Sequence, residues 1–359
     1  MILAGIDEAG YGPLLGPLVV CASAFAVPGD MQDQIQHGDF TVAETLWPLL
    51  KRAVARKGPL RDGRLVVADS KLVHAMTGGI GLLERTVLAM LLQPAAARTV
   101  EEMPSTTAQL LTTLGVPLLN GVPPLASPAR PEGPVVRDFQ FFPPQPWYGH
   151  AAAGAPATVP AFTSRAGLGI GASMLAGALA AADISLAALW AIVVDEDLFN
   201  RRVAATGNKA TTLASVTFTH IALLADRFAG RGLLLVVDKQ GGRTHYVHDL
   251  LQTFPDWALK ILKETPEESS YFLHHGQRQM LLSFREKSEL TSFATALASM
   301  TAKYLRELLM AHFNAWFCAR IPGLKPTAGY YQDGKRWLED VAPHLAALNI
   351  SHDQLVRIK

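Results

Sequence analysis

Apolar and polar residues alternate in blocks along this chain, and the first blocks predict two strands joined by a tight turn. Residues 2–7 form an apolar run that ends in Asp7 and Glu8, and residues 17–27 form a second run that ends at Pro28. Between the runs lie three glycines and two prolines, which are typical turn residues. Adjacent strand residues point to opposite faces of a sheet. The two carboxylates can therefore share a site only if the first strand breaks at Glu8, and the glycines that follow favour such a break.

Downstream, the pattern predicts helices alternating with strands. Helices are expected over 43–55, 81–93, 166–182, 208–228, 292–317 and 334–348. Strands are expected over 186–194, 231–238, 257–262 and 271–274, with a short strand running into a polar turn over 64–72 and an acidic turn at 195–197. Such alternation is typical of a layered α/β domain. We expect a mixed central sheet flanked by helices, with a helical C-terminal portion.

The segment 93–165 interrupts this pattern. Thirteen of the 23 prolines lie between residues 94 and 160, and so much proline cannot continue helices or a central sheet. The segment also contains aromatic residues, which argue against a fully solvated linker: Phe139, Phe141, Phe142, Trp147 and Tyr148. We interpret it as an irregular insertion that packs on a main domain formed by residues 1–92 and 166–359.

Composition and charge limit the function classes only weakly. The chain has 359 residues, of which 49% are apolar and 18% charged, so a substantial core is expected and global disorder is excluded. A net charge of +1 gives no support for nucleic-acid binding by the whole chain. One segment is locally basic, and it is either a solvated surface or a nucleic-acid contact: Lys51, Arg52, Arg56, Lys57, Arg61, Arg64 and Lys71.

Cysteine usage and hydropathy predict a cytoplasmic protein without a membrane span. Cys21 and Cys318 are far apart and lack the spacing of a zinc site, so they are interpreted as buried apolar residues in a reducing compartment. No basic leader precedes the first apolar run, which argues against a signal peptide. Residues 167–194 are apolar but broken near Asp183, so a buried helix followed by a buried strand is expected there.

Four carboxylates could carry chemistry. Asp7, Glu8 and Asp238 end apolar runs, and Glu307 lies in the predicted helix 292–317. Carboxylates at strand ends suit Mg²⁺ or Mn²⁺, and a glycine turn can direct N–H groups at an anion. Taken alone, however, Asp238 could simply cap a turn, and Glu307 could form a surface ion pair with Lys303.

The segment from Asp7 to Pro17, Asp-Glu-Ala-Gly-Tyr-Gly-Pro-Leu-Leu-Gly-Pro, resembles the opening motif of the type 2 ribonucleases H, the RNase HII family. The family usually has Arg where this chain has Tyr11. Three further blocks resemble family segments in the same order: Asp69-Ser70-Lys71, Ala298 to Glu307, and Thr327 to Tyr331. The family has Gly after its third acidic residue and Asp at the end of its helix, whereas this chain has Lys239 and Glu307.

The resemblance implies a ribonuclease H-like fold and a two-metal site. Asp7, Glu8, Asp238 and Glu307 would bind two Mg²⁺ or Mn²⁺ ions and serve as the catalytic residues. Nucleic acid would be bound by Gly10, Tyr11, Gly12, Lys71 and Tyr330. From the residues alone, Asp69-Ser70-Lys71 could instead be a helix N-cap, and Tyr330 a buried core aromatic.

The implied activity is endonucleolytic hydrolysis of RNA in RNA/DNA hybrids, or at ribonucleotides embedded in duplex DNA. Because the 2′-hydroxyl distinguishes RNA from DNA and Tyr11 has no guanidinium, strict ribonucleotide specificity is less firmly implied than metal-dependent phosphodiester chemistry. Two alternatives stay open. One is a nucleic-acid-binding module of this fold that has lost catalysis, and the other is a related nuclease for another nucleic-acid structure.

Overall fold

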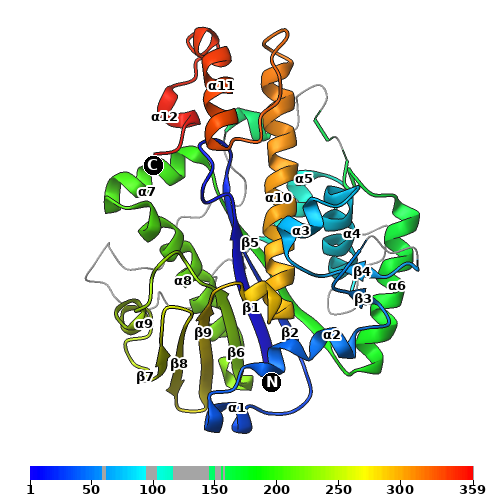
Figure 1. The fold of residues 1–359 in the computed structure, drawn as a ribbon, viewed down its shortest axis with the longest axis vertical. Helices are drawn as coiled ribbons and strands as arrows, with labels where there is room; N and C mark the ends of the chain where they lie inside the picture. The colour runs from blue at the N-terminus through cyan, green and yellow to red at the C-terminus, as the bar shows by residue number, and fades with distance from the viewer. Residues whose placement is uncertain (59–61, 94–102, 116–144, 150–154, 157, 359) are drawn as a thin grey trace.

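The computed structural model describes residues 1–58, 62–93, 103–115, 145–149, 155–156 and 158–358, and a seven-stranded mixed sheet lies at the centre of this part of the chain (Figure 1). In spatial order the strands are β5 (Ser185–Val194), β2 (Leu18–Ala26), β1 (Ile2–Ala9), β6 (Leu233–Asp238), β9 (Arg278–Arg285), β8 (Glu268–His275) and β7 (Ala258–Glu264). Strands β1, β6 and β9 are parallel neighbours, and the remaining pairings in this sheet are antiparallel.

Helices cover both faces of the sheet. The long helix α10 (Phe293–Cys318) crosses one face over β1 and β2, and α4 (Gly79–Leu91) packs between it and α6 (Arg165–Ala181). Smaller elements on this side are α1 (Gln32–His37), η1 (Thr41–Glu44), α2 (Leu46–Leu49), α3 (Ser70–His74), α5 (Thr107–Leu114), η4 (Pro146–Tyr148), η6 (Ser288–Leu290), and the strand pair β3 (Val54–Ala55) and β4 (Leu65–Val66).

The opposite face is covered by α8 (Lys209–Phe228), with α7 (Glu196–Thr206), α9 (Val247–Thr253) and η5 (Ala229–Arg231) around it. The C-terminal portion contains α11 (Tyr331–Val341), η7 (Ala342–His344) and α12 (His352–Leu355), which lie near the upper ends of α7 and α10 in Figure 1. The predicted mixed sheet flanked by helices, with a helical C-terminal portion, is confirmed.

Helix α10 is fixed to the sheet by its first residues. The hydroxyl of Ser292 caps the helix by accepting from the Thr295 amide. The hydroxyls of Ser23 and Thr295 donate to the carbonyls of Ala294 and Val236, which ties α10 to β2 and β6. At Gly5 of β1, an added Cβ would lie 2.1 Å from the Thr295 nitrogen, so only glycine permits this approach. These contacts set the position of every side chain that α10 presents toward the end of β1.

Two apolar cores result, one on each side of the sheet. The first packs α10, α4 and α6 against one face, and the second packs α8 against the other. Strands β1 and β6 contribute to both cores, which is why their sequences are continuous apolar runs rather than alternating ones.

Several predicted elements differ from those observed. Residues 43–55 do not form one helix, because Pro48 lies inside the range and the segment divides into η1, α2 and β3. The acidic turn at 195–197 is the start of helix α7, with Asp195 as its N-cap. The polar turn after residues 65–66 is likewise helical (α3), and strand β9 was not predicted.

Within the proline-rich segment, the described residues include a helix and a buried tryptophan, Trp147. Helix α5 occupies a stretch that contains no proline. In η4, Trp147 is 1% exposed and its ring packs against Phe313, Trp316 and Phe317 of α10. Trp147 therefore packs on α10, whereas Phe139, Phe141 and Phe142 lie outside the described residues.

None of the helices described here is both long and apolar enough to cross a membrane. Residues 167–194 form most of α6 and all of β5, which confirms the expected helix followed by a strand. Cys21 is buried and Cys318 half-buried, and both are free thiols.

Candidate acidic site at the ends of strands β1 and β6

Three of the predicted carboxylates lie together where two parallel strands end. Ile6 of β1 pairs with Val237 of β6, so Asp7 and Asp238 follow side by side across the sheet. Asp7 falls on the face covered by α10, and Glu8 on the face covered by α8. The carboxyl ends of parallel strands are a common position for ligand sites in α/β proteins.

The predicted break of the first strand at Glu8 is wrong. Strand β1 continues through Ala9, with Glu8 paired with Val20 and Ala9 paired with Val19 of β2. On its other side β1 loses its partner, because β6 ends at Asp238. The carboxylates of Asp7 and Glu8 both interact electrostatically with that of Asp238, although they leave the strand on opposite faces.

Burial raises the pKa of all three carboxyl groups, and neighbouring carboxylates add to the shift for Asp7 and Glu8. Burial raises the pKa of Asp7 well above its usual range, and the charges of Glu8 and Asp238 raise it further. Burial and the charge of Asp238 raise the pKa of Glu8 to about 8, although the ammonium of Lys71 opposes this shift. The pKa of Asp238 is raised by burial, against hydrogen bonds from the amide and hydroxyl of Ser288. A site with this charge distribution favours a bound cation.

Helices α10 and α3 supply neutral and basic groups to the same site. The hydroxyl of Ser299 on α10 is hydrogen-bonded to Asp7 and also to the hydroxyl of Ser70 on α3. Asp69 accepts hydrogen bonds from the amides of Lys71 and Leu72, so it is the N-cap of α3. The N-cap alternative therefore holds for Asp69, while the charge of Lys71 acts on both Glu8 and Asp238.

A further carboxylate near the site was not predicted from the sequence. Glu289 lies in η6, directly after Ser288, which hydrogen-bonds to Asp238. Burial raises the pKa of Glu289, and the charges of Asp238 and Asp69 add to that shift. The sequence signal was weak, because Glu289 lies in a polar stretch between two apolar runs, where an acidic residue is usually a surface residue.

The fourth predicted carboxylate, Glu307, has mainly basic neighbours. Its Oε1 lies 2.6 Å from the Lys303 ammonium and 3.4 Å from the Arg306 guanidinium, and its Oε2 lies 3.8 Å from His74. Burial alone would raise its pKa, but Lys303 and Arg306 outweigh burial and lower it. The structure thus forms the Lys303–Glu307 pair.

The glycine turn between β1 and β2, residues 10–17, is held by groups from distant parts of the chain. Gly10 has a φ of +88°, and an added Cβ would lie 2.4 Å from the Pro17 carbonyl and 2.8 Å from the Arg306 side chain. Glycine is therefore required at this position. Arg306 also donates to the Leu15 carbonyl at 3.3 Å, and Gly329 accepts from the Leu14 amide at 2.8 Å.

The buried side chains of Glu196 and Arg357 also hold the glycine turn. Glu196 of α7 accepts from the Gly16 amide at 3.0 Å and from the Tyr148 hydroxyl at 2.7 Å. Burial raises the pKa of Glu196 to about 7. Arg357 donates to the carbonyls of Tyr11 and Pro13, each at 2.8 Å.

The residues predicted to contact nucleic acid differ in exposure. Tyr11 is half-buried, with the Lys209 ammonium 5.2 Å from its ring centre, and Gly12 is exposed. Tyr330 is 50% exposed, so the alternative that it is a core residue is wrong. The Arg306 guanidinium lies 5.5 Å from the Tyr330 ring centre, which links this ring to the glycine turn.

Lys239, which replaces a family glycine, has a structural role. Its side chain is buried, and its ammonium donates to the Thr265 carbonyl at 2.9 Å and to the Pro266 carbonyl. It thereby ties the end of β6 to the turn between β7 and β8.

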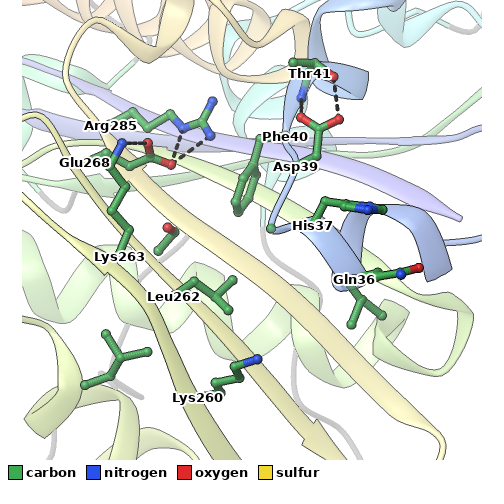
Figure 2. Close-up of a pocket in the computed structure, with 14 residues that line it drawn as sticks. Gln36, His37, Asp39, Phe40, Thr41, Lys260, Leu262, Lys263, Glu268 and Arg285 are labelled. Carbon is green, nitrogen blue, oxygen red and sulfur yellow. Dashed lines mark hydrogen bonds and ion pairs between the residues drawn. The ribbon is translucent and has the colours of Figure 1, made fainter.

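A cavity of about 440 Å³ lies on the same face of the sheet, lined by residues of α1, η1, β7, β8 and β9. Arg285 is the register partner of Asp238, and Glu268 is the partner of Arg285, so a charged row runs across β6, β9 and β8. Figure 2 shows Lys263 and Arg285 joined to Glu268 on the sheet side, with His37, Asp39 and Phe40 opposite them. Strand β7 lies three strands from β6, which is roughly 14 Å.

The carboxylate oxygens of Asp7, Glu8 and Asp238 are suitable ligands for a hard divalent cation, but they are not arranged around one point. The charge of Asp238 raises the pKa of Asp7 and Glu8, and the cation Lys71 lowers the pKa of Glu8 and Asp238. Within the residues that the structure describes, no three His, Cys, Asp or Glu side chains converge closely enough to hold a metal ion. Binding would therefore require these side chains to turn toward a shared ion.

Comparisons with known proteins found a short sequence match and a structural alignment. No family model matches the chain. Over 36 residues the chain is 53% identical to a ribonuclease HII of Methanocaldococcus jannaschii, a match that covers 10% of this chain and 15% of that protein. The crystal structure of the ribonuclease H2 from Pyrococcus horikoshii OT3 aligns over 99% of this chain and 92% of its own, with 12% sequence identity and a TM-score of 0.35. The sequence similarity is thus to a ribonuclease HII and is limited to this short segment.

Proposed function

We propose that this chain is a metal-dependent nuclease that cuts RNA in RNA/DNA hybrids or at ribonucleotides embedded in duplex DNA. The observation that carries the proposal is the group of Asp7, Glu8 and Asp238 at the ends of β1 and β6, directly before the glycine turn. The short segment that is similar to a ribonuclease HII supports the same reaction class. The proposed fold type is ribonuclease H-like.

Asp7, Glu8 and Asp238 would hold Mg²⁺ or Mn²⁺, which suit oxygen ligands. Such ions supply Lewis-acid stabilisation of charge on a phosphoryl group and make water a better nucleophile at neutral pH. Ser299 and Ser288 orient two of the carboxylates, and Lys71 offers a cation to a phosphate beside them. For a fourth carboxylate, Glu307 is the residue predicted from the sequence, and Glu289 is one whose pKa is raised by the charge of Asp238.

The substrate would lie over the exposed side of the glycine turn and continue toward the cavity on β9, β8 and β7. Lys260, Lys263 and Arg285 line that cavity and could face the phosphates that neighbour the cut. Tyr330 and Tyr11 would supply aromatic surfaces to a sugar or base.

The decisive experiment uses three labelled substrates: duplex DNA with one ribonucleotide, an RNA/DNA hybrid and all-DNA duplex. Each is incubated with Mg²⁺, Mn²⁺ or EDTA. We expect cutting of at least one RNA-containing substrate that EDTA abolishes and that Asp238→Asn reduces by about a thousandfold or more, as for groups that act directly in catalysis. Full metal-dependent activity of Asp7→Asn or Asp238→Asn would show that this site is not the catalytic one.

The fourth ligand is tested in the same assay. Because Glu307 is paired with Lys303 while the charge of Asp238 acts on Glu289, we expect Glu289→Gln to reduce cutting by about tenfold or more, and Glu307→Gln to reduce it less. The opposite order would place Glu307 at the metal site, as the sequence predicted.

A binding module without catalysis is the second candidate, favoured by the absence of a closed metal cage among the described residues. Duplex binding without cutting of any substrate would support it. Metal-dependent cutting of DNA or of a branched structure, without preference for RNA, would instead indicate a related nuclease with another target.

A further inference from the structure

The segment 351–358 lies against the glycine turn, although more than 330 residues separate the two in sequence. The backbone amide of Arg357 donates to the Leu14 carbonyl at 2.9 Å, and its guanidinium Nη2 donates to the carbonyls of Tyr11 and Pro13, each at 2.8 Å. Three carbonyls of the turn therefore accept from one residue.

This arginine is deeply buried and firmly held. Its side chain is 3% exposed, and its guanidinium carbon lies 4.5 Å from the ring centre of Phe199 on α7. Two of its nitrogens, Nε and Nη1, are buried and have no hydrogen-bond partner among the described residues. Burying a charged guanidinium costs free energy, and the hydrogen bonds that it does make must offset this cost.

Asn200 of α7 fixes the segment that carries Arg357. Its side-chain amide donates to the carbonyls of Asp353 and Val356 at 2.6 and 2.7 Å, and its Oδ1 accepts from the Ile358 amide at 2.7 Å. Ser351 and Gln354 form a capping box at the start of α12. The position of Arg357 is thus set by α7 and α12 and does not depend on the turn alone.

The contact at Tyr11 has a stereochemical consequence. In a trans peptide the C=O of one residue and the N–H of the next point in opposite directions. Because the Tyr11 carbonyl points to Arg357, the Gly12 N–H points away from it, and Gly12 is exposed. Within the described part of the chain, the Gly12 amide has no protein partner. An outward N–H beside a carboxylate site is a donor for a ligand oxygen.

We infer that Arg357 is a positioning residue: it holds the Tyr11–Gly12 peptide so that the Gly12 N–H can donate to an oxygen of the nucleic-acid strand beside Asp7 and Glu8. The inference rests on the proposed function for the identity of the ligand. The guanidinium groups of Arg306 and Arg357 both contact this turn, and that of Arg357 is bonded to the Tyr11 carbonyl.

The test compares Arg357→Gln, Arg357→Lys and Asn200→Ala with the unaltered protein. On the RNA-containing substrate that is cut best, we expect Arg357→Gln to raise KM by about tenfold to a hundredfold while kcat changes by less than about threefold, because a charged donor to two carbonyls is lost. Arg357→Lys should recover part of the loss, since an ammonium can reach a carbonyl. Asn200→Ala, which leaves Arg357 in place but frees its segment, should shift KM in the same direction.

Arg320→Gln is the matched control. Arg320 also donates to a backbone carbonyl, that of Trp316 at 3.0 Å, and lies 3.9 Å from that ring centre, but it does not touch the turn. The KM of the Arg320→Gln variant should equal that of the unaltered protein. Equal KM values for Arg357→Gln and Arg320→Gln, in folded proteins, would overturn the inference.

Amide hydrogen exchange provides a readout that does not need catalysis. We expect residues 10–17 to exchange at least about tenfold faster in Asn200→Ala and Arg357→Lys than in the unaltered protein, with helix α8 unchanged. If the protein cuts no substrate, the proposed function fails while this measurement still decides whether Arg357 orders the turn. Unchanged exchange in residues 10–17 would overturn the inference even in an active nuclease.

Discussion

At the scale of single residues, the site is defined by where charges are buried and what faces them. The charge of Asp238 acts on Asp7 and Glu8, whereas Glu307 is paired with Lys303 and Arg306. The sequence was sufficient to select these four carboxylates as candidate site residues, because the selection used only residue type and the order of the motifs. It did not single out Glu289, on which the charge of Asp238 acts, since side-chain direction depends on the position of the helix.

Glu196 leads to a prediction about pH and stability. Its pKa is about 7 in the folded protein, above the usual value of 4.5, so the folded state holds its proton more tightly than the unfolded state does. Its contribution to stability is therefore fully present below about pH 4.5 and is lost as pH rises through about 7. Glu196→Gln keeps an oxygen that can accept from the Gly16 amide but cannot ionise.

We expect the variant to be more stable than the unaltered protein at pH 8, by up to about 3 kcal/mol, and this difference to vanish toward pH 4.5. Thermal unfolding from pH 4.5 to 8 measures the difference directly. A constant difference across that range would mean that Glu196 does not titrate there.

At the scale of elements, the turn between β1 and β2 is built by its neighbours as much as by its own sequence. Arg306 of α10, Glu196 of α7, Gly329 and Arg357 all bind its backbone. The glycines and prolines predicted a turn correctly. Their spacing could not reveal these partners, because each comes from a part of the chain that only the fold brings near.

Two glycines of this turn form a matched pair for mutation. Gly10→Ala places a Cβ 2.4 Å from the Pro17 carbonyl at a φ of +88°, whereas a Cβ at Gly12 would have no neighbour within 4 Å and no such φ constraint. We expect Gly10→Ala to destabilise the protein by about 2 kcal/mol or more and Gly12→Ala by less than about 1 kcal/mol. Chemical denaturation measures both values. Equal losses would indicate that the turn adapts by moving Arg306.

At the scale of the whole molecule, one sheet face joins the acidic site to the cavity on β9, β8 and β7. The charged row from Asp238 through Arg285 to Glu268 exists because these strands are neighbours in register. The other face is closed by α8. A long nucleic acid bound at the carboxylates would therefore be expected to continue along the cavity side.

This expectation is tested by removing one exposed cation from each face. Lys260→Gln alters the cavity, and Arg227→Gln alters the exposed side of α8. We expect Lys260→Gln to weaken duplex binding and to reduce the slope of log affinity against log salt by about 1, as for one lost phosphate contact. Arg227→Gln should leave both unchanged. If the two variants behave alike in fluorescence anisotropy, the duplex does not pass over the cavity.

The sequence by itself determined the layered α/β class, most long elements and the carboxylates that end apolar runs, because periodicity and residue type are local properties. It did not determine that β1 continues past Glu8, since pairing with β2 outweighs the local tendency of the following glycines to end a strand. Only the tertiary structure decided which charges meet. It paired Glu307 with Lys303, brought Glu289 toward Asp238 and placed Arg357 on the glycine turn, because such contacts depend on strand order and helix packing, which no short stretch of sequence encodes.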